Sequence, residues 1–293
     1  MAMKNIRDVS TRLLHATIDK LLGVNSRQIL NVGIVPESID GDIAVSMRTI
    51  IDQLKMEGFD TEKGLVNYES LKGSANYKRY KKITASLHDF DLSSLQNREE
   101  KLAFWINLYN SLIVDAVITY GIKNSIWEAG YGFFRKIAYD IGGLRYSADD
   151  IEHGILRGNR HHPYIPLPQF AQTDPRIKYT IIPFEPRIHF TLVCASRSCP
   201  IITVYHASDV EEELEMATNS FINGGSVIVK PNEGSVSLSR IFKWYQSDFS
   251  GRYGVISFVL RYLKDGLDKD FLIENINKVR IQYQHYDWSL NHY

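Results

Sequence analysis

The fold is decided by the stretch Arg98-Glu-Glu-Lys-Leu-Ala-Phe-Trp-Ile-Asn-Leu-Tyr-Asn-Ser-Leu-Ile-Val-Asp-Ala-Val-Ile118. Acidic residues at its start favour a helix N-terminus, and Gly121 is a residue type that commonly ends a helix. From Leu102 onward the stretch is apolar on nearly every face, whereas a surface helix would be apolar on one face only. The sequence therefore predicts a buried central helix over about residues 99–118.

The segments on either side of this helix differ in type. Before it, apolar residues recur at helical spacing in residues 8–22, 43–54 and 77–87. After residue 135 strands become frequent: two short strands are expected on either side of Gly142-Gly143, a hairpin over 227–238 and a last strand over 279–283. Further helices are expected over 148–156, 209–222, 255–263 and 271–276.

This order of elements predicts an α+β fold, in which a mixed or antiparallel sheet packs around the buried central helix. We divide the chain into an N-terminal helical portion, residues 1–60, and a main α+β domain, residues 61–293. A short internal echo, Pro175-Arg-Ile-Lys-Tyr-Thr180 and Pro186-Arg-Ile-His-Phe-Thr191, predicts two successive strands with a turn between them.

The composition is that of a globular protein and argues against several classes. Hydrophobic residues make up 44% of the chain, and 34 basic residues balance 34 acidic ones, so the charge gives no support to nucleic-acid binding. Two cysteines are too few for a disulfide-rich secreted scaffold. Residues 1–22 lack the uninterrupted apolar core of a signal peptide, and we expect no membrane span. We expect a cytoplasmic protein, with a removed export signal as the alternative.

Reactive side chains concentrate in Arg187-Ile-His-Phe-Thr-Leu-Val-Cys-Ala-Ser-Arg-Ser-Cys-Pro200, which holds both cysteines of the chain. The apolar run 188–193 predicts a strand that ends at the first cysteine. Because Pro200 favours the first turn of a helix, Cys199 could be an N-cap with its sulfur near free backbone N–H groups. Such a position, or a neighbour such as Arg197, lowers a thiol pKa from about 8.5. A reactive thiol, inert packed thiols and a local disulfide all fit this spacing.

Two further side chains of this stretch share a face of the expected strand. Arg187 and His189 are two residues apart and point to the same side, whereas His189 and Cys194 point to opposite sides. An Arg–His cluster with Glu185 is therefore expected, either as part of a site or as a satisfied polar network. A histidine that serves as base would then reach Cys199 only through curvature of the loop.

A polar stripe interrupts the apolar central helix. Asn107, Asn110 and Ser111 are related by i, i+3 and i+4 and therefore share one face. Leaving a buried amide unpaired costs about 1–3 kcal/mol, so both asparagines need fixed partners. We favour structural bracing over the orientation of a catalytic histidine. We also expect a side-chain contact from these asparagines to Glu152-His153 or to Arg187-x-His189, with the cysteine loop lying over it.

The short helix expected over 148–156, with Ser147 as its N-cap, carries an oriented histidine. Asp149 and His153 are four residues apart, as are His153 and Arg157, so each pair is adjacent on one helix face. A histidine held in this way suits acid–base catalysis or metal binding.

Taken in order, these motifs resemble the family called domain of unknown function 547, over about residues 60–291. The resemblance is most specific in the central helix and the cysteine stretch. It implies a module found in some relatives beside glutaredoxin-like or other signalling domains, and it implies no established reaction. The chain departs from the family pattern over 174–185, where the Pro-Arg-Ile motif is duplicated. The matching segments are Val66-Asn-Tyr68, Ala103-Phe-Trp-Ile-Asn-Leu-Tyr-Asn110, Ser125-Ile126, Gly143 with Ser147, Ile151-Glu-His153 with Leu156-Arg157, Pro186-Arg-Ile-His-Phe-Thr-Leu-Val-Cys194, Ser198-Cys-Pro200, Lys243-Trp-Tyr245 with Asp248-Phe249, and Tyr286-Asp-Trp-Ser-Leu-Asn291.

A looser, fold-level analogy is to papain-like and transglutaminase-like enzymes, although the central helix here lacks their cysteine. Our leading hypothesis is accordingly a cysteine-dependent hydrolase or acyl-transfer enzyme of papain-like character, acting on an unknown small molecule or peptide. The alternative is a non-enzymatic interaction or scaffold domain in which the same motif is structural. Zinc is a weaker third hypothesis, because Cys-x4-Cys is looser than the usual Cys-x2-Cys pattern; we predict no metal and no cofactor.

The residues assigned to a site are Cys199 or Cys194 as nucleophile, His189 or His153 as base, Asn107 or Glu152 as the orienting group, and Arg187, Asn110 and Arg197 for substrate binding.

Overall fold

The computed structural model describes residues 2–33 and 42–293, with side chains from residue 7 onward. The chain forms two compact units. Unit 1 comprises Met1–Glu185, Leu192–Val210 and Trp288–Tyr293, and unit 2 comprises Pro186–Thr191 and Glu211–Asp287. The predicted α+β class with a buried central helix is confirmed, and the strands of the described residues form three small sheets. The predicted domain boundary near residue 60 stays a prediction.

Helix α5 (Arg98–Tyr120) is the centre of unit 1. A capping box closes its first turn, in which the Asn97 side chain accepts the N–H of Glu100 and the Glu100 carboxylate accepts the N–H of Asn97. Gly121, at φ 63°, ends the helix. Every residue from Leu102 to Ile118 is buried. By length and composition α5 could cross a membrane, but 94% of its apolar window is buried inside the protein, as in a core helix.

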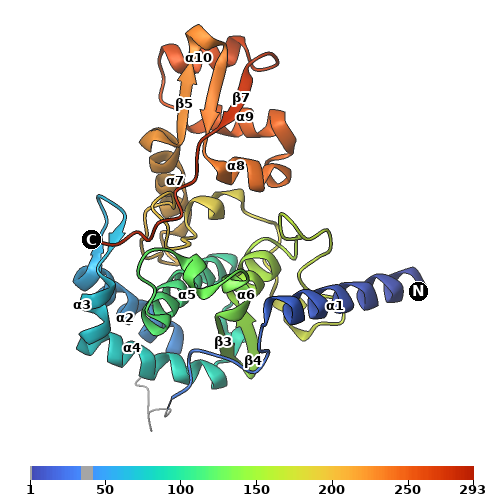
Figure 1. Ribbon diagram of the computed structural model, residues 1–293, viewed down its shortest axis with the longest axis vertical. Helices are drawn as coiled ribbons and strands as arrows, with labels where there is room; N and C mark the ends of the chain where they lie inside the picture. Colours follow the sequence, from blue (N-terminus) through green and yellow to red (C-terminus); the bar gives the residue numbers. More distant parts are fainter. Residues whose placement is uncertain (1, 34–41) are drawn as a thin grey trace. The chain divides into compact units, whose positions relative to one another are not determined.

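The other elements of unit 1 surround α5. Helices α2, α3 and α4 lie on one side of it, and the antiparallel hairpin β3–β4, which turns at Gly142-Gly143, lies on the other (Figure 1). The bounds are α1 (Ala2–Leu22), α2 (Ile43–Gly58), β1 (Phe59–Asp60), β2 (Leu65–Val66), α3 (Tyr68–Gly73), α4 (Ala75–Ala85), α6 (Phe133–Lys136), β3 (Ala138–Ile141), β4 (Leu144–Ser147), the π-helix η4 (Asp150–Leu156) and the 3-10 helix η5 (Pro175–Tyr179).

A buried carboxylate joins three of these elements. Asp115 of α5 is fully buried and accepts hydrogen bonds from Tyr77 (2.5 Å) and Lys81 (2.7 Å) of α4 and from Tyr139 (2.7 Å) of β3. The Lys81 ammonium and the two phenols offset the cost of burying the charge. The contact fixes β3 against α5, and η4 follows directly after β4, so the same contact helps to place η4.

The echoed Pro-Arg-Ile segments are 3-10 helices, so the prediction of two strands, including a strand over 188–193, is wrong. In η5 the Asp174 carboxylate accepts the N–H of Arg176 at 2.9 Å, with proline at the first helical position. In η6 (Pro186–Phe190) both the N–H and the hydroxyl of Thr191 bond to the Ile188 carbonyl, at 3.0 and 2.8 Å. These local bonds close a turn and leave the backbone unable to pair as a strand.

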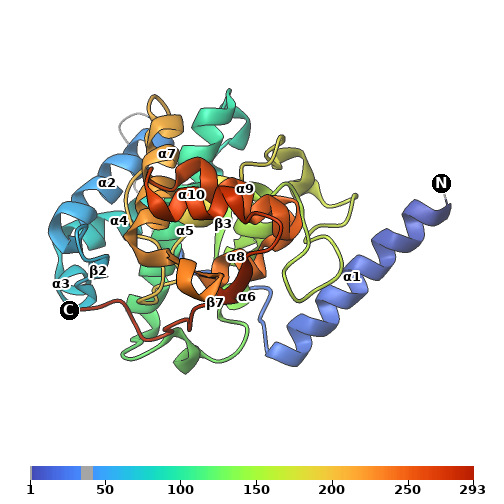
Figure 2. The ribbon, with the colours of Figure 1, turned by 90° about the horizontal axis from the view of Figure 1, so that it is seen from above.

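Unit 2 combines a three-stranded sheet with four helices. Strand β6 (Ser235–Leu238) is central, antiparallel to β5 (Val227–Lys230) and parallel to β7 (Arg280–Tyr283), which confirms the predicted hairpin and last strand. The helices are α7 (Val210–Phe221), α8 (Arg240–Trp244), α9 (Gly251–Tyr262) and α10 (Leu267–Glu274), with α9 and α10 side by side (Figure 2).

An aromatic core holds η6 inside unit 2. The ring of Phe190 lies 4.9 Å from Phe221, 5.4 Å from Phe242, 6.1 Å from Phe249 and 5.8 Å from Phe258, measured between centroids. Such aromatic pairs add stabilisation beyond the area they bury. The position of η6, and with it that of His189, is therefore set by side chains from four other elements of the unit.

Candidate functional site

Both cysteines lie on an irregular segment of unit 1, with their sulfurs 2.7 Å apart. The Cys199 sulfur also accepts the backbone N–H of Cys194 at 2.9 Å, and the Ser196 hydroxyl lies 3.2 and 3.3 Å from the two sulfurs. Ala195 makes the turn at φ 61°, a left-handed conformation that costs a non-glycine residue about 1–2 kcal/mol. Both thiols are half-buried, and N–H donation favours negative charge on Cys199 in particular.

Cys199 is not the N-cap of a helix, so that expectation is wrong. Residues 200–206 contain no helix, and the next helix, α7, begins at Val210. The run Ile201-Ile202-Thr203-Val204 explains the difference, because β-branched residues lose side-chain freedom in a helix and disfavour it.

The polar stripe of α5 holds this segment at both ends. Asn107 donates to the Tyr205 carbonyl at 2.7 Å and accepts the Tyr205 N–H at 2.9 Å, as a paired strand would. Asn110 accepts the N–H of Val193 at 3.0 Å. One anchor precedes the cysteines in the chain and the other follows them, so these hydrogen bonds are the structural bracing that we expected. The predicted side-chain contact from the asparagines to Glu152-His153 or Arg187-x-His189 stays a prediction.

Helix η4 presents an oriented histidine, as predicted. The Ser147 hydroxyl accepts the N–H of Asp150 at 3.1 Å, and Arg157 Nη1 donates to His153 Nδ1 at 2.9 Å. Asp149 Oδ1 lies 3.9 Å from His153 Nε2. The π-helical winding is a form that recurs at functional sites.

Glu152 is anchored to the central helix through Tyr109. Its Oε2 accepts the hydroxyl of Tyr109 at 3.2 Å, and its Oε1 lies 3.8 Å from His153 Nδ1. Gly154 lets η4 approach the neighbouring loop closely, since a Cβ there would lie 2.2 Å from two ring atoms of Phe170.

Asp149, His153 and His162 bring their ligand-type atoms within 4.8 Å of one another. An arginine can only donate, so Arg157 makes His153 Nδ1 the acceptor and puts the ring proton on Nε2. The N–H of Tyr164 likewise donates to His162 Nδ1 at 3.1 Å. Neither histidine then has a lone pair to offer from Nε2, and each Nδ1 is already occupied. This pattern opposes a metal ion at the cluster.

The surroundings of the cluster shift its pKa values strongly. Burial, with the positive charges of Arg135 and Arg157, lowers the pKa of His162 to about 4. Burial raises the pKa of Asp149 to about 7, against the attraction of Arg135 and with repulsion from Glu152. At neutral pH the cluster therefore holds a neutral His162 and a carboxyl group that gives up its proton far less readily than a free aspartate does.

His189 lies in unit 2 and is paired with a carboxylate that the sequence analysis did not assign. Its Nε2 lies 2.8 Å from Asp248 Oδ2, both side chains are buried, and the ring stacks on Tyr245 with centroids 3.9 Å apart. The ionised carboxylate can only accept, so Nε2 carries a proton, and a neutral ring would have its lone pair on Nδ1. This is the tautomer of a general base that a carboxylate orients.

The two loop arginines proposed for substrate binding have partners of their own. Arg187 of unit 2 contacts Glu211 at 2.5 Å and Glu215 at 3.4 Å, so an anion would compete with two carboxylates. Arg197 of unit 1 is exposed and donates to the His292 carbonyl at 3.3 Å.

Sequence reasoning missed Asp248 and Tyr245 as functional candidates, although both belong to the Lys243-Trp-Tyr245 and Asp248-Phe249 motif. A lone acidic residue within an otherwise aromatic motif was the available signal. Within unit 1 the structure brings the two cysteines together and places Glu152 beside His153; Arg187 and His189 belong to unit 2.

Residues 92–222 match the family model described as Protein of unknown function, DUF547. The predicted resemblance is therefore confirmed, and the DUF547 match spans α5, η4 and the whole cysteine segment. No curated protein and no solved structure matches the chain.

Proposed function

We propose that the protein is a cysteine-dependent hydrolase or acyl-transfer enzyme of papain-like character, with Cys199 or Cys194 as nucleophile and His189 or His153 as general base. The observation that supports it best is the buried pair of His189 and Asp248, whose 2.8 Å hydrogen bond selects the tautomer a base needs. In this proposal Asp248 takes the orienting role that the sequence analysis gave to Asn107 or Glu152.

His189 is a better base than His153. Arg157 donates to His153 Nδ1 at 2.9 Å, so protonation would place a positive imidazolium directly against a guanidinium. His189 instead faces a carboxylate, which stabilises the imidazolium that forms when the ring accepts a proton. The Asn107 side chain bonds to the Tyr205 backbone through both its amide nitrogen and its amide oxygen, which suits a bracing role.

Cys199 is a better nucleophile than Cys194. Its sulfur receives the Cys194 N–H at 2.9 Å, and a hydrogen bond to the charged form favours the thiolate. The thiolate would attack an acyl carbon and form a thioester, while the protonated general base gives its proton to the leaving group. Water, or a second acceptor, would then release the acyl group.

The test uses p-nitrophenyl acetate and iodoacetamide, two probes that need no knowledge of the natural substrate. We expect acetylation at Cys199, found by mass spectrometry of the intact protein and its peptides, and alkylation faster than that of glutathione. Cys199→Ala should abolish both. His189→Gln and Asp248→Asn should slow acetylation by about 100-fold or more at neutral pH.

Cys194→Ser serves as the matched control, because it keeps Cys199 and removes only the neighbouring thiol. Far-UV circular dichroism would confirm that each variant is folded. If neither thiol reacts faster than glutathione, or if His189→Gln leaves the rates unchanged, the enzyme proposal is wrong.

A second candidate function, an interaction or scaffold domain, is favoured by the way Asn107 and Asn110 hold both ends of the cysteine segment. A motif kept for its architecture would show this bracing without reactivity. In that case Cys199→Ala would lower the free energy of unfolding by about 1–3 kcal/mol and change no chemical rate.

A further inference from the structure

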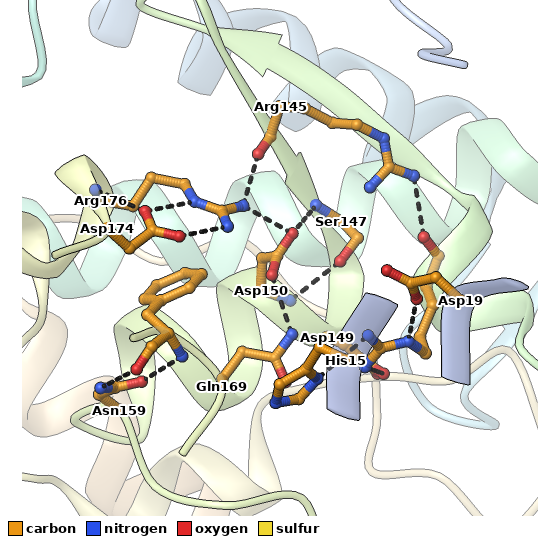
Figure 3. Close-up of polar contacts among 12 residues, drawn as sticks. His15, Asp19, Arg145, Ser147, Asp149, Asp150, Asn159, Gln169, Asp174 and Arg176 are labelled. Atoms are coloured by element: carbon orange, nitrogen blue, oxygen red, sulfur yellow. Dashed lines mark hydrogen bonds and ion pairs between the residues drawn. The ribbon is translucent and has the colours of Figure 1, made fainter. Parts of the chain in front are cut away.

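An open pocket of about 400 Å³ in unit 1 is lined by residues of α1, β4 and η5 and by the segments beside them. Its wall is rich in charge and includes Arg135, Arg145 and Arg176; Figure 3 shows the guanidinium groups of Arg145 and Arg176. Its volume lies within the range of small-molecule sites, about 300–1,000 Å³. None of the residues proposed above for catalysis lines it.

Two of the three arginines are matched by carboxylates. Arg176 bonds to Asp174 at 2.8 Å and to Asp150 at 2.9 Å. Arg135 bonds to Asp19 at 2.6 Å. These pairs account for the three carboxylates of the pocket wall and are structural contacts.

Arg145 differs because its hydrogen bonds go to backbone carbonyls. Nε donates to Gln28 at 3.1 Å, and Nη2 donates to Arg135 at 2.8 Å and to Lys136 at 3.0 Å. Within residues 2–33 and 42–293 it forms no ion pair, and Nη1 has no hydrogen bond. In Figure 3 the unbonded nitrogen points toward the space between Ser147 and Asp19. Burial lowers the pKa of Arg145 although Asp150 and Asp19 attract its charge, so an anion placed here would stabilise the guanidinium further.

The opposite side of this space offers an acceptor. Asp19 uses Oδ1 for Arg135, and its second carboxylate oxygen makes no hydrogen bond within the described residues. Ser147 accepts the N–H of Asp150 through its oxygen, which leaves the hydroxyl proton to donate. One region of the pocket thus presents the Arg145 cation and the Ser147 hydroxyl as donors. The second carboxylate oxygen of Asp19 lies opposite them, too far from Arg145 to form an ion pair with it.

We propose that this pocket binds a free α-amino acid, with its carboxylate on Arg145 and Ser147 and its ammonium group on Asp19. A zwitterion satisfies both sides at once, because charge-assisted hydrogen bonds form at each end. The C-terminal residue of a peptide carries the same carboxylate, but its nitrogen is an uncharged amide and would leave the second carboxylate oxygen of Asp19 without a charged partner. The free amino acid is therefore the source that the charges favour.

The first measurement is isothermal titration calorimetry of the full chain with each of the common L-amino acids. For any that binds, the amide lacks the carboxylate, the N-acetyl derivative lacks the ammonium group, and the tripeptide Gly-Gly-X presents the same residue at a C-terminus. We expect each analogue to bind at least about tenfold more weakly, since each loses a charge-assisted contact. No binding by any amino acid overturns the proposal. Equal binding of the tripeptide overturns the free amino acid in favour of a peptide C-terminus.

Two variants test the location. Arg145→Met removes the guanidinium and keeps the length of the stem, but it also removes three bonds to carbonyls. Ser26→Trp avoids that difficulty, because Ser26 is exposed at the wall of the pocket and forms no hydrogen bond within the described residues. Both should weaken amino-acid binding at least about tenfold. Ser70→Trp, on the exposed face of α3, is the matched control and should bind like wild type. If Ser26→Trp also binds like wild type, the pocket is not the site.

Discussion

Replacing Asp149 by Asn should stabilise the protein above neutral pH and flatten the dependence of its free energy of unfolding on pH. Burial raises the pKa of Asp149 from 3.8 to about 7. Arg135 does not cancel this effect, because its Nη1 lies 3.7 Å from Asp149 while its Nε bonds to Asp19 at 2.6 Å. The native protein therefore keeps a proton on Asp149 that the unfolded chain has already lost.

The sign and size of the effect follow from this difference. A carboxyl group with a raised native pKa contributes stability that is fully present below its unfolded pKa of 3.8 and is lost as pH rises through about 7. A shift of about 3 units, at about 1.4 kcal/mol each, gives about 4 kcal/mol over this window. His162 contributes with the opposite sign, because its pKa is lowered from 6.5 to about 4, so the stability it adds grows as pH rises between those values.

Subtracting the free energy of unfolding of Asp149→Asn from that of wild type at each pH cancels the contribution of His162, because both proteins contain this histidine. Urea unfolding between about pH 5 and pH 8, followed by tryptophan fluorescence, reports on unit 1 through Trp105, Trp127 and Trp288. The wild-type free energy of unfolding, minus that of the variant, should fall by up to about 3 kcal/mol as pH rises from about 5 to 8, because about 2 of the 3 pH units of the decline lie in this range. Asp268→Asn, at an exposed position of α10, is the control and should show no such trend. A difference that is constant or rises with pH would mean that Asp149 is ionised in the native protein, and the reasoning would be refuted.

Three further predictions concern packing, bracing and the thiols. Asn107→Ala removes the side-chain partners of the Tyr205 N–H and carbonyl and should lower the free energy of unfolding by about 2–4 kcal/mol in urea; a loss under about 0.5 kcal/mol would argue against bracing. Gly154→Ala would place a methyl group 2.2 Å from the Phe170 ring and should cost about 1–3 kcal/mol in the same assay, less in a Phe170→Leu background; equal costs in both backgrounds would contradict this cause. Treatment with diamide should link Cys194 to Cys199, whose sulfurs lie 2.7 Å apart, and block alkylation until a reductant is added; two thiols that stay freely alkylated would contradict it.

The sequence predicted the parts of the fold that depend on local signals. Helix α5 could be predicted because its caps and its apolar faces lie within one stretch, and the β3–β4 hairpin because Gly142-Gly143 marks its turn. The strand expected over 188–193 was wrong because the apolar residues there are buried by distant phenylalanines around Phe190, while Thr191 closes a local turn that a periodicity argument does not weigh. Propensity was overridden by tertiary packing.

For the candidate site, too, the sequence predicted the contacts that depend on local spacing and missed those that depend on the fold. His153 and Arg157 are four residues apart, which places them next to each other on one helix face. Their contact could therefore be inferred from the sequence. The pairing of His189 with Asp248 joins positions 59 residues apart, and only the fold of unit 2 brings them together. Asp149 could be placed beside His153, but its raised pKa depends on burial that no local pattern reveals.

The asparagine anchors of α5 have a consequence for how the cysteine segment moves. Amide hydrogens in irregular segments usually exchange with solvent through small local openings. The amide hydrogens of Val193 and Tyr205, however, are bonded to side chains of a helix that is buried along most of its length. Their exchange requires α5 itself to release them, so both should exchange as slowly as the core of unit 1. The cysteine segment thus has its mobility limited at two points by a helix that is buried along most of its length, although the segment has no regular secondary structure of its own.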